Sequence, residues 1–220
     1  MSTRTGIVIF TALLAIAAFV AGASWYGRAQ QEQGSSLAAA HAGSMERPHL
    51  PMLGPAAAPV TIVEFLDPAC EACRAFHPHV KQILRSHPER VRLVIRYAPF
   101  HGDVSVTGVR ILEAARRQGR FEPVLDALMR GQPVWASHGA PAPERAWEFA
   151  REAGLELGTA REFNAGDTVE KMLEQEVADL QAVGVRFTPT FFVNGQPLAE
   201  PDPAALLRMV EEALGEARAQ

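Results

Sequence analysis

The sequence predicts an α/β fold in which one sheet is assembled from two distant parts of the chain. A strand–helix–strand unit reads from residue 60 to residue 97, and a strand, a tight turn, a return strand and a closing helix follow from residue 190. Almost everything between these two parts reads as helix. The order βαβ, helices, ββα predicts a sheet covered by helices, with a helical insertion at about 103–166 between its two halves.

The composition excludes several classes of protein. Of the 220 residues, 48% are hydrophobic and 21% are charged, which is the balance of a folded chain. The formal net charge of −4 argues against a general nucleic-acid binder, so we expect no nucleic-acid partner. The two cysteines, Cys70 and Cys73, are too few for a disulfide-stapled scaffold or a four-thiolate zinc site. A C-x-x-C pair in so long a chain therefore indicates chemistry.

Residues 1–27 read as a transmembrane anchor or a signal peptide. The 23 residues from Thr5 onward carry no charge, which is enough to cross a bilayer, and the aromatic pair Trp25-Tyr26 closes the stretch. The run Ala21-Gly22-Ala23 also fits a signal-cleavage site. Both interpretations place residues 28–220 in the periplasm or outside the cell, and an uncleaved helix would make the lipid bilayer a partner.

Residues 28–50 lack periodicity and are rich in Gln, Ser, Gly and Ala, which predicts a flexible linker before a folded domain at 51–217. The apolar and β-branched run at 60–66 predicts a strand that is buried on both faces. A helix from Cys70 to about His87 and a second strand at 91–97 follow it. This order implies two parallel strands joined by a crossover helix.

The second half of the domain is predicted to be helical before it returns to the sheet. Glycines punctuate the helical segments up to Gly184, and strand character returns at 190–193. The dipeptide Asn194-Gly195 is a strong two-residue hairpin signal, with a return strand at 196–199. A closing helix at 203–217 has proline in its first turn.

The spacing of the two cysteines suits thiol–disulfide exchange. Cys70 falls where strand gives way to helix, so unpaired backbone N–H groups and the helix dipole favour its thiolate. Cys73 lies one helical turn further on the same face, within reach of a disulfide. In such a pair the first sulfur reacts with a partner and the second resolves the mixed disulfide.

Three segments resemble the DsbA-like thiol:disulfide oxidoreductases of the thioredoxin superfamily. The run from Glu64 to Cys73 resembles the active-site segment of that family, and the run from Gly184 to Gly195 resembles its cis-proline loop and hairpin. Tyr97-Ala98-Pro99-Phe100 leading into a helix also fits. The resemblance spans about 55–215 and implies a thioredoxin fold, membrane-anchored or secreted, with the helical insertion described above.

The resemblance also implies roles for individual residues. Cys70 would be the nucleophile, Cys73 the resolving thiol and Pro189 the cis-proline, with the Thr188 backbone pairing with substrate by β-augmentation. Glu64 occupies the buried-acid position of the family, where a carboxyl of raised pKa could relay the proton of Cys73. The alternative for Glu64 is an exposed strand edge without a catalytic role.

The same resemblance sets expectations for cofactor and partners. The Cys70–Cys73 pair is itself the redox group, and the sequence contains no nucleotide, flavin or metal motif. Expected partners are unfolded or thiol-containing protein substrates and a membrane redox partner, and the short linker favours a monomer. Whether the chain works as an oxidase, a reductase or an isomerase stays open.

The dipeptide between the cysteines departs from the family. The strongest oxidants carry a histidine there, whereas this chain has Glu71-Ala72. An acidic neighbour is expected to raise the pKa of Cys70, and we predict a reduction potential below that of the strongest oxidants.

Two other functions compete with this one. Two thiolates and the imidazole of His77, with His79 and His101 nearby in sequence, could make a thioredoxin-like copper chaperone. A non-catalytic, membrane-anchored interaction domain that inherited the fold is the other alternative.

Overall fold

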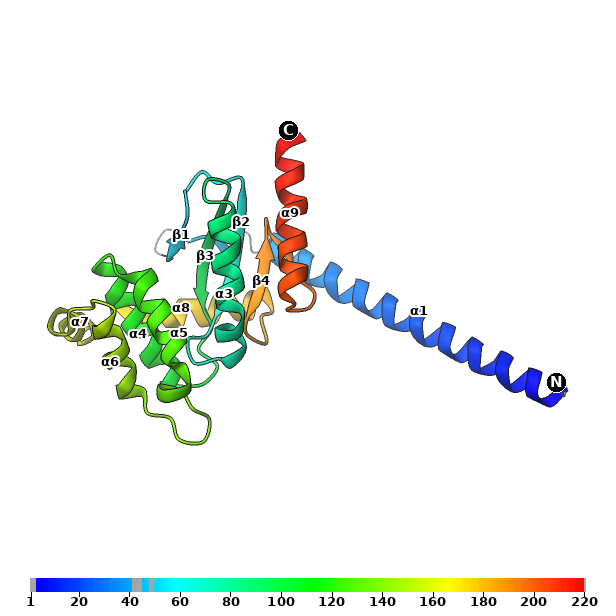
Figure 1. The fold of residues 1–220 in the computed structure, drawn as a ribbon, viewed down its shortest axis with the longest axis horizontal. Coiled ribbons are helices and arrows are strands. Elements are labelled where there is room, and N and C mark those ends of the chain that lie inside the picture. Colours follow the sequence, from blue (N-terminus) through cyan, green and yellow to red (C-terminus); the bar gives the residue numbers. More distant parts are fainter. Residues whose placement is uncertain (1–2, 41–44, 48–49, 220) are drawn as a thin grey trace.

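The structure of the chain is a computed structural model that describes residues 3–40, 45–47 and 50–219. A central sheet lies between helices on both faces, and one long helix projects from the domain (Figure 1). The predicted α/β fold with a thioredoxin-type sheet and a helical insertion is confirmed.

The sheet has five strands in the order β1-β3-β2-β4-β5. The strands are β1 (Met52–Leu53), β2 (Val60–Leu66), β3 (Val91–Tyr97), β4 (Thr190–Val193) and β5 (Gln196–Pro197). β2 runs parallel to β3 and antiparallel to β4, and every residue of β2 is buried. The sequence did not predict β1, which is two residues long and pairs antiparallel with β3.

Alternate residues of β2 and β4 face two separate apolar clusters. Ile62 and Phe191 lie in the larger cluster, with α3 (Glu71–Ser86) and α9 (Pro203–Ala219). Val63 and Phe192 lie in the smaller cluster, with α8 (Thr168–Val183). Because side chains alternate along a strand, β2 contacts both layers of helices. The C-x-x-C motif follows directly after the carboxyl end of β2.

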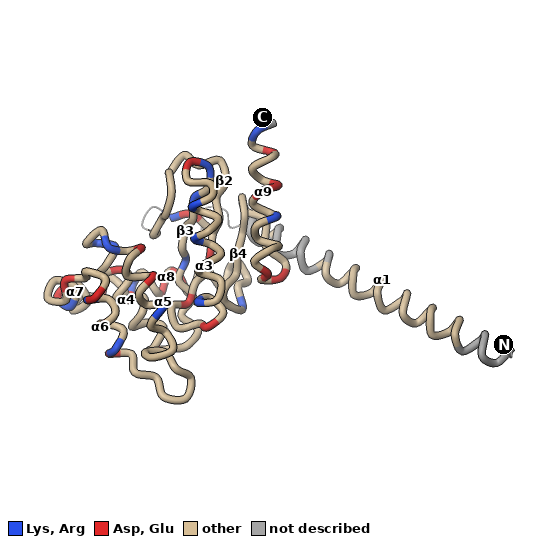
Figure 2. Tube along the Cα trace, viewed as in Figure 1, with Lys and Arg blue, Asp and Glu red and all other residues tan. Residues whose placement is uncertain are grey.

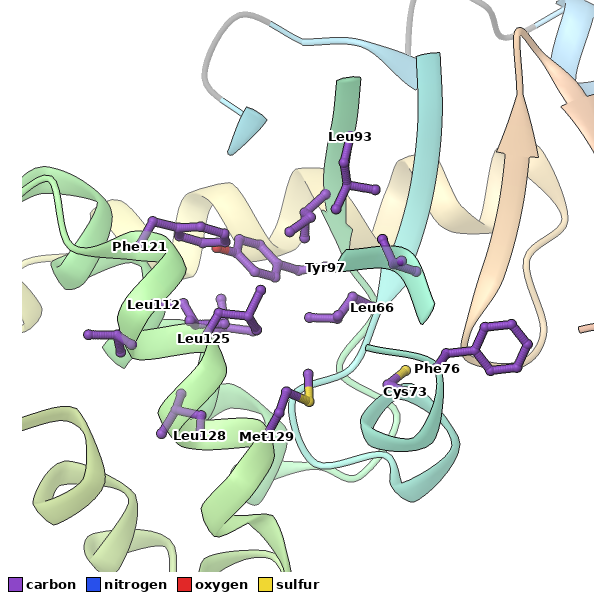
Figure 3. Packing of buried hydrophobic residues seen from close by; sticks show 14 of the residues in the cluster. Leu66, Cys73, Phe76, Leu93, Tyr97, Leu112, Phe121, Leu125, Leu128 and Met129 are labelled. Carbon is purple, nitrogen blue, oxygen red and sulfur yellow. The ribbon is translucent and has the colours of Figure 1, made fainter. Parts of the chain in front are cut away.

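The helical insertion contributes to the larger cluster, on the side of the sheet that carries α3. It contains α4 (Asp103–Arg117), α5 (Phe121–Trp135), a short 3-10 turn (Pro143–Arg145), α6 (Ala146–Glu152) and α7 (Leu157–Asn164). Figure 3 shows side chains of α5, among them Leu125 and Met129, directed toward Leu66 at the end of β2 and toward Cys73 on α3. The insertion therefore forms one wall of the region around the cysteines.

The long amino-terminal helix α1 (Thr3–Ala40) differs from the sequence prediction. Within the described residues, the stretch Ile9–Gly27 is apolar and long enough to cross a membrane, and none of that stretch is buried against the domain. The helix then continues to Ala40 through the first part of the predicted flexible linker at 28–50. Alanine, glutamine, glutamate and arginine dominate that part, and these residues favour helix.

The last part of the predicted linker also differs, because some of its residues belong to the folded region. Met45 and Leu50 are buried in the cluster on the α8 side of the sheet. Arg47 Nε lies 2.6 Å from the carboxylate of Asp179 on α8. Ordered contacts therefore begin before the predicted boundary at residue 51, since these apolar side chains cover a sheet face that would otherwise be exposed.

Candidate active site at the Cys70–Cys73 motif

A short turn between β2 and α3 holds Cys70 at the amino end of the helix. Asp67 is buried, and its carboxylate accepts a hydrogen bond of 2.9 Å from the Ala69 N–H. The Cys70 N–H donates to the Asp67 carbonyl over 3.1 Å. Cys70 itself has extended backbone angles and caps α3, so its sulfur lies beside the first N–H groups of the helix.

The cis-proline loop meets this sulfur from the other half of the chain. The Thr188–Pro189 peptide bond is cis, as the family resemblance implied. The Cys70 thiol donates a hydrogen bond of 3.3 Å to the carbonyl of Thr188, which lies 118 positions away in sequence. The two segments predicted to form the site are therefore side by side.

The two thiols lie in different environments. Cys70 is 8% exposed, whereas Cys73 is fully buried in the apolar cluster that contains Leu66 and Phe76 (Figure 3). Of the two cysteines, Cys70 keeps a small exposed surface and contacts the cis-proline loop, whereas Cys73 has no exposed surface.

The environments also move the two pKa values in opposite directions. A hydrogen bond from the Cys73 thiol, helped by the backbone N–H groups of Cys73 and Ala72, lowers the pKa of Cys70 to about 5 against the effect of burial. Burial raises the pKa of Cys73 well above its usual range, and the hydrogen bond to Cys70 and the charge of Glu64 raise it further. A stabilised thiolate beside a protonated thiol is the arrangement that exchange requires.

Glu64 lies inside the sheet rather than at an exposed edge. Its side chain is 1% exposed in the middle of β2, between Ile95 on β3 and Phe191 on β4. Its Oε1 atom has no hydrogen-bond partner among the described residues. Burial, followed by the charge of Cys70, raises the pKa of Glu64 to about 8. A carboxyl group with this pKa can hold and release a proton near neutral pH.

The expectation that Glu71 raises the pKa of Cys70 is wrong. The Glu71 side chain is exposed on the first turn of α3, and its ion-pair partner is His138, whose Nε2 lies 4.0 Å from Glu71 Oε1. Solvent screens this carboxylate, whereas Cys73 and the helix N–H groups act on the Cys70 sulfur by direct contact.

The structure does not place His77 with the cysteines as a metal ligand. His77 Nε2 lies 2.7 Å from Asp126 Oδ1 on α5. His101 Nδ1 lies 2.6 Å from the carboxylate of Asp67. Within the described part of the chain, no group of three or more His, Cys, Asp or Glu side chains is arranged to hold a metal ion. The copper-chaperone alternative therefore gains no support from the geometry.

Sequence reasoning missed two residues that hold the active-site turn. Gln132 on α5 is buried, and its Nε2 donates to the carbonyls of Pro68, at 2.8 Å, and of Cys70, at 2.9 Å. Asp67 accepts further N–H bonds from Phe100 and His101, and so links the turn to the loop after β3. A polar residue within the apolar face of α5 was the available signal for Gln132, but the sequence does not say what such a residue contacts.

Solved structures resemble this architecture over most of the chain. A thioredoxin-like oxidoreductase from Silicibacter pomeroyi is 30% identical, with a TM-score of 0.67 over 80% of this chain and 97% of that one. The thiol-disulfide exchange protein α-DsbA2 from Wolbachia pipientis is 20% identical, with a TM-score of 0.72 over 84% and 97%. BdbD from Bacillus subtilis is 23% identical, with a TM-score of 0.68 over 76% and 94%.

Curated relatives match about two thirds or more of the chain in sequence. A Na(+)/H(+) antiporter NhaA from Herminiimonas arsenicoxydans is 32% identical over 161 residues, which are 73% of this chain and 25% of that protein. An antiporter NhaA 3 from Salinispora tropica is 33% identical over 146 residues, 65% of this chain and 21% of that protein. The chain thus spans about a quarter or less of the length of these relatives.

A family model described as thioredoxin matches residues 46–212, which include both cysteines, the insertion and the cis-proline loop. The resemblance to DsbA-like proteins is thereby confirmed at the level of family and fold: the chain belongs to the thioredoxin family.

Proposed function

We propose that the chain is a thiol–disulfide oxidoreductase that exchanges disulfides with thiol-containing protein substrates through Cys70 and Cys73. One observation carries this proposal. An accessible thiol with a pKa of about 5 contacts the cis-proline loop, and the thiol one turn behind it is buried with a raised pKa. Membership of the thioredoxin family and the likeness to a thioredoxin-like oxidoreductase at 30% identity support the same activity.

When the chain donates its disulfide, a substrate thiolate attacks the Cys70 sulfur and the Cys70–Cys73 bond breaks. Cys73 leaves as a thiolate and takes a proton, which Glu64 supplies because its pKa is about 8. A second substrate thiolate attacks the substrate sulfur of the mixed disulfide and releases Cys70 as a thiolate. Two electrons pass from the substrate to the cysteine pair, and the reverse sequence reduces a substrate disulfide.

The cis-proline loop would position the substrate for this attack. We propose that the backbone of Thr188 pairs with an extended substrate segment, so that its cysteine faces Cys70 across the loop. Pro189, which has no N–H group, follows Thr188 and leaves the carbonyl of Thr188 directed at the Cys70 sulfur.

The pKa of Cys70 predicts a range for the reduction potential of the cysteine pair. Nucleophilic cysteines of C-x-x-C motifs have pKa values from about 7 in thioredoxin to about 3.5 in DsbA, and potentials from about −270 to about −120 mV. From a value of about 5 for Cys70 we propose a potential between these limits. Equilibration of the purified chain with glutathione buffers measures the potential, and a value at either limit would contradict the assignment.

Loss of each cysteine distinguishes their roles. Cys70→Ser should abolish the reduction of insulin and the oxidative refolding of a reduced protein. Cys73→Ser should instead accumulate a mixed disulfide between Cys70 and substrate, because the resolving thiol is absent. A Cys70→Ser variant that retains exchange would contradict the proposal and leave the non-catalytic interaction domain as the better description.

The redox group is proposed to be the cysteine pair alone, in a chain that works as a monomer. Activity should survive exhaustive dialysis against a chelator without added cofactor. A loss of activity that one metal ion restores would contradict this and favour the copper-chaperone alternative.

We propose that the domain works outside the cytoplasm, held at the membrane by the stretch Ile9–Gly27. The match to proteins named as Na(+)/H(+) antiporters supports a location at the bilayer, and a membrane redox partner would be within reach there. The full chain should sediment with membranes, resist alkaline extraction and be open to protease from outside the inner membrane. A soluble product that lacks residues 1–23 would instead indicate a cleaved signal peptide.

A further inference from the structure

A groove of about 480 Å³ runs between α3 and α5, beside the active-site turn. Its lining is dominated by positively charged side chains, although the chain as a whole carries a net charge of −4. The charged residues and the one histidine that line it are Arg74, His77, Lys81, Arg85, Asp126 and Arg130. The charged positions of α3 and α5 can be followed in Figure 2.

The cations of α3 lie on one stripe that begins at Cys70. Arg74, Lys81 and Arg85 follow Cys70 by four, eleven and fifteen residues, which are all near whole turns of a helix. The stripe therefore leads away from the reactive sulfur along the surface of α3. From Arg74 to Arg85 the helix rises by about 16 Å, which matches about five residues of extended polypeptide.

The carboxylates near the groove do not neutralise it. Asp126 contacts both Lys81 and His77, and Glu122 lies 3.5 Å from Lys81. Among the described residues, no carboxylate lies within ion-pair distance of Arg74, Arg85 or Arg130. Three guanidinium groups are left to face the groove without a negative partner.

A buried side chain connects the groove to the reactive cysteine. Arg74 Nε donates a hydrogen bond of 3.1 Å to Gln132 Oε1, and Gln132 Nε2 donates to the Cys70 carbonyl. Gln132 therefore fixes the Arg74 head group at the active-site end of the groove, while Arg85 and Arg130 are exposed. When a substrate reacts at Cys70, the substrate residues next to its own cysteine lie beside this row of positive charges.

We propose that this groove binds an acidic segment adjacent to the reacting cysteine of a protein substrate. The proposal rests on the function proposed above and names the class of substrate that the chain prefers. Carboxylates on an extended segment would form charge-assisted hydrogen bonds with the unpaired guanidinium groups and would also be steered toward them during encounter. The chemistry at sulfur is unchanged: Cys70 forms the mixed disulfide and Cys73 resolves it.

The test uses disulfide-linked dimers of short peptides in which four residues beside one cysteine are all Glu, all Gln or all Lys. The reduced full chain in detergent converts each dimer into two thiols while Cys70 and Cys73 become a disulfide. Each rate is divided by the rate at which dithiothreitol reduces the same dimer, because neighbouring charges alter the cysteine itself. The Glu dimer should react about tenfold faster than the Gln dimer at low salt, and the Lys dimer more slowly.

Charge-neutralising variants identify the groove as the source of this preference. Arg85→Gln combined with Arg130→Gln should reduce the Glu preference several-fold, because only Arg74 and Lys81 then remain as cations of the groove. The rate with the neutral hydroxyethyl disulfide should not change. Arg161→Gln, on an exposed position of α7, is the matched control and should leave the preference intact. The preference should also shrink at about 1 M salt, where the Debye length falls to about 3 Å.

Equal normalised rates for the three dimers, or a Glu preference that is unchanged in the double variant, would overturn the groove proposal. Failure of the wild-type chain to react even with hydroxyethyl disulfide would instead overturn the proposed oxidoreductase function. The neutral disulfide therefore separates the two failures.

Discussion

Cys70 and Cys73 are one helical turn apart, yet burial separates their chemistry. The helix amino end and the Cys73 thiol stabilise the Cys70 thiolate, whereas burial of Cys73 in the apolar cluster outweighs the one backbone hydrogen bond, to Asp67, that favours its thiolate. Under the proposed function, this asymmetry makes Cys70 the cysteine that takes part in the first chemical step. It also predicts how each thiol reacts with a small alkylating reagent.

The alkylation of Cys70 by iodoacetamide should rise with pH about a midpoint near 5, since only the thiolate reacts. Cys73 should stay unmodified at neutral pH because it is buried and protonated. Mass spectrometry of the reduced chain, with Cys70→Ser as the control, measures both rates. A midpoint near 9, the ordinary value for a thiol, would contradict the described environment.

Glu64 is expected to lower the folding stability of the chain at high pH, because its carboxyl group is buried beside the thiols. Its folded-state pKa of about 8 exceeds the ordinary value of 4.5, so the folded chain binds the extra proton between these pH values. The stabilisation that protonated Glu64 contributes is fully present below about pH 4.5, and it is lost as the pH rises through about 8.

Glu64→Gln should therefore stabilise the chain by a few kcal/mol above pH 8 and remove most of this pH dependence. The same variant should slow disulfide exchange, because the amide cannot supply a proton to Cys73. Urea unfolding of the reduced protein across pH 4–9 measures the first effect as the difference between wild type and variant, because the Cys70 charge that helps raise the pKa of Glu64 exists only in the reduced state. An unchanged pH profile would show that Glu64 titrates normally.

At the scale of the elements, α5 couples the insertion to the active site. Its face toward the sheet carries Leu125 and Met129 into the cluster around Cys73, and Gln132 holds the turn that carries Cys70 (Figure 3). Close contact with α6 keeps this helix in place. A Cβ at Gly131 would lie 2.6 Å from the ring of Phe149.

Gly131→Ala should destabilise the chain by about 1–3 kcal/mol, because two helices have to separate to admit the methyl group. Gly215→Ala on α9 is the matched control, since nothing within the described residues lies within 4 Å of its Cβ. That variant should stabilise the helix by about 0.5–1 kcal/mol. Thermal unfolding of the two variants measures the difference, and equal effects would contradict the contact with Phe149.

Across the whole molecule, a buried ionic network joins the sheet, α8 and the segment before β1. Arg96 on β3 contacts Glu176 through Nε at 2.8 Å and Asp179 through Nη2 at 2.8 Å. Asp179 also contacts Arg47 at 2.6 Å. The network lies on the sheet face opposite the insertion, so it stabilises the domain without contacting the thiols.

Arg96→Met should cost about 3–5 kcal/mol, because it leaves the carboxylates of Glu176 and Asp179 buried without this guanidinium. Adding Glu176→Gln to the same chain should recover part of the loss. The bonds to arginine help lower the pKa of Asp179, so its contribution is present at neutral pH and is lost as the pH falls. The cost of Arg96→Met should therefore be smaller at pH 4 than at pH 7 in urea unfolding.

The periodicity of the sequence was sufficient to predict most of the elements. The strands expected at 60–66, 91–97 and 190–193 are β2, β3 and β4, because continuous apolar runs between turn residues have one favourable conformation in a domain core. The two-residue β1 and the continuation of α1 to Ala40 were missed. β1 is too short to show a pattern, and the residues from 28 to 40 favour helix by composition but have no apolar periodicity that marks one.

The sequence by itself determined which residues the proposed chemistry uses, because a C-x-x-C motif after a buried strand and a proline before another strand are local patterns. Only the tertiary structure decided their environments. It placed Thr188 against Cys70 across 118 positions, buried Glu64, turned Glu71 to solvent and brought Gln132 under the active-site turn. The physical reason is that pKa values and hydrogen bonds depend on neighbours in space, and folding brings such neighbours from distant parts of the chain.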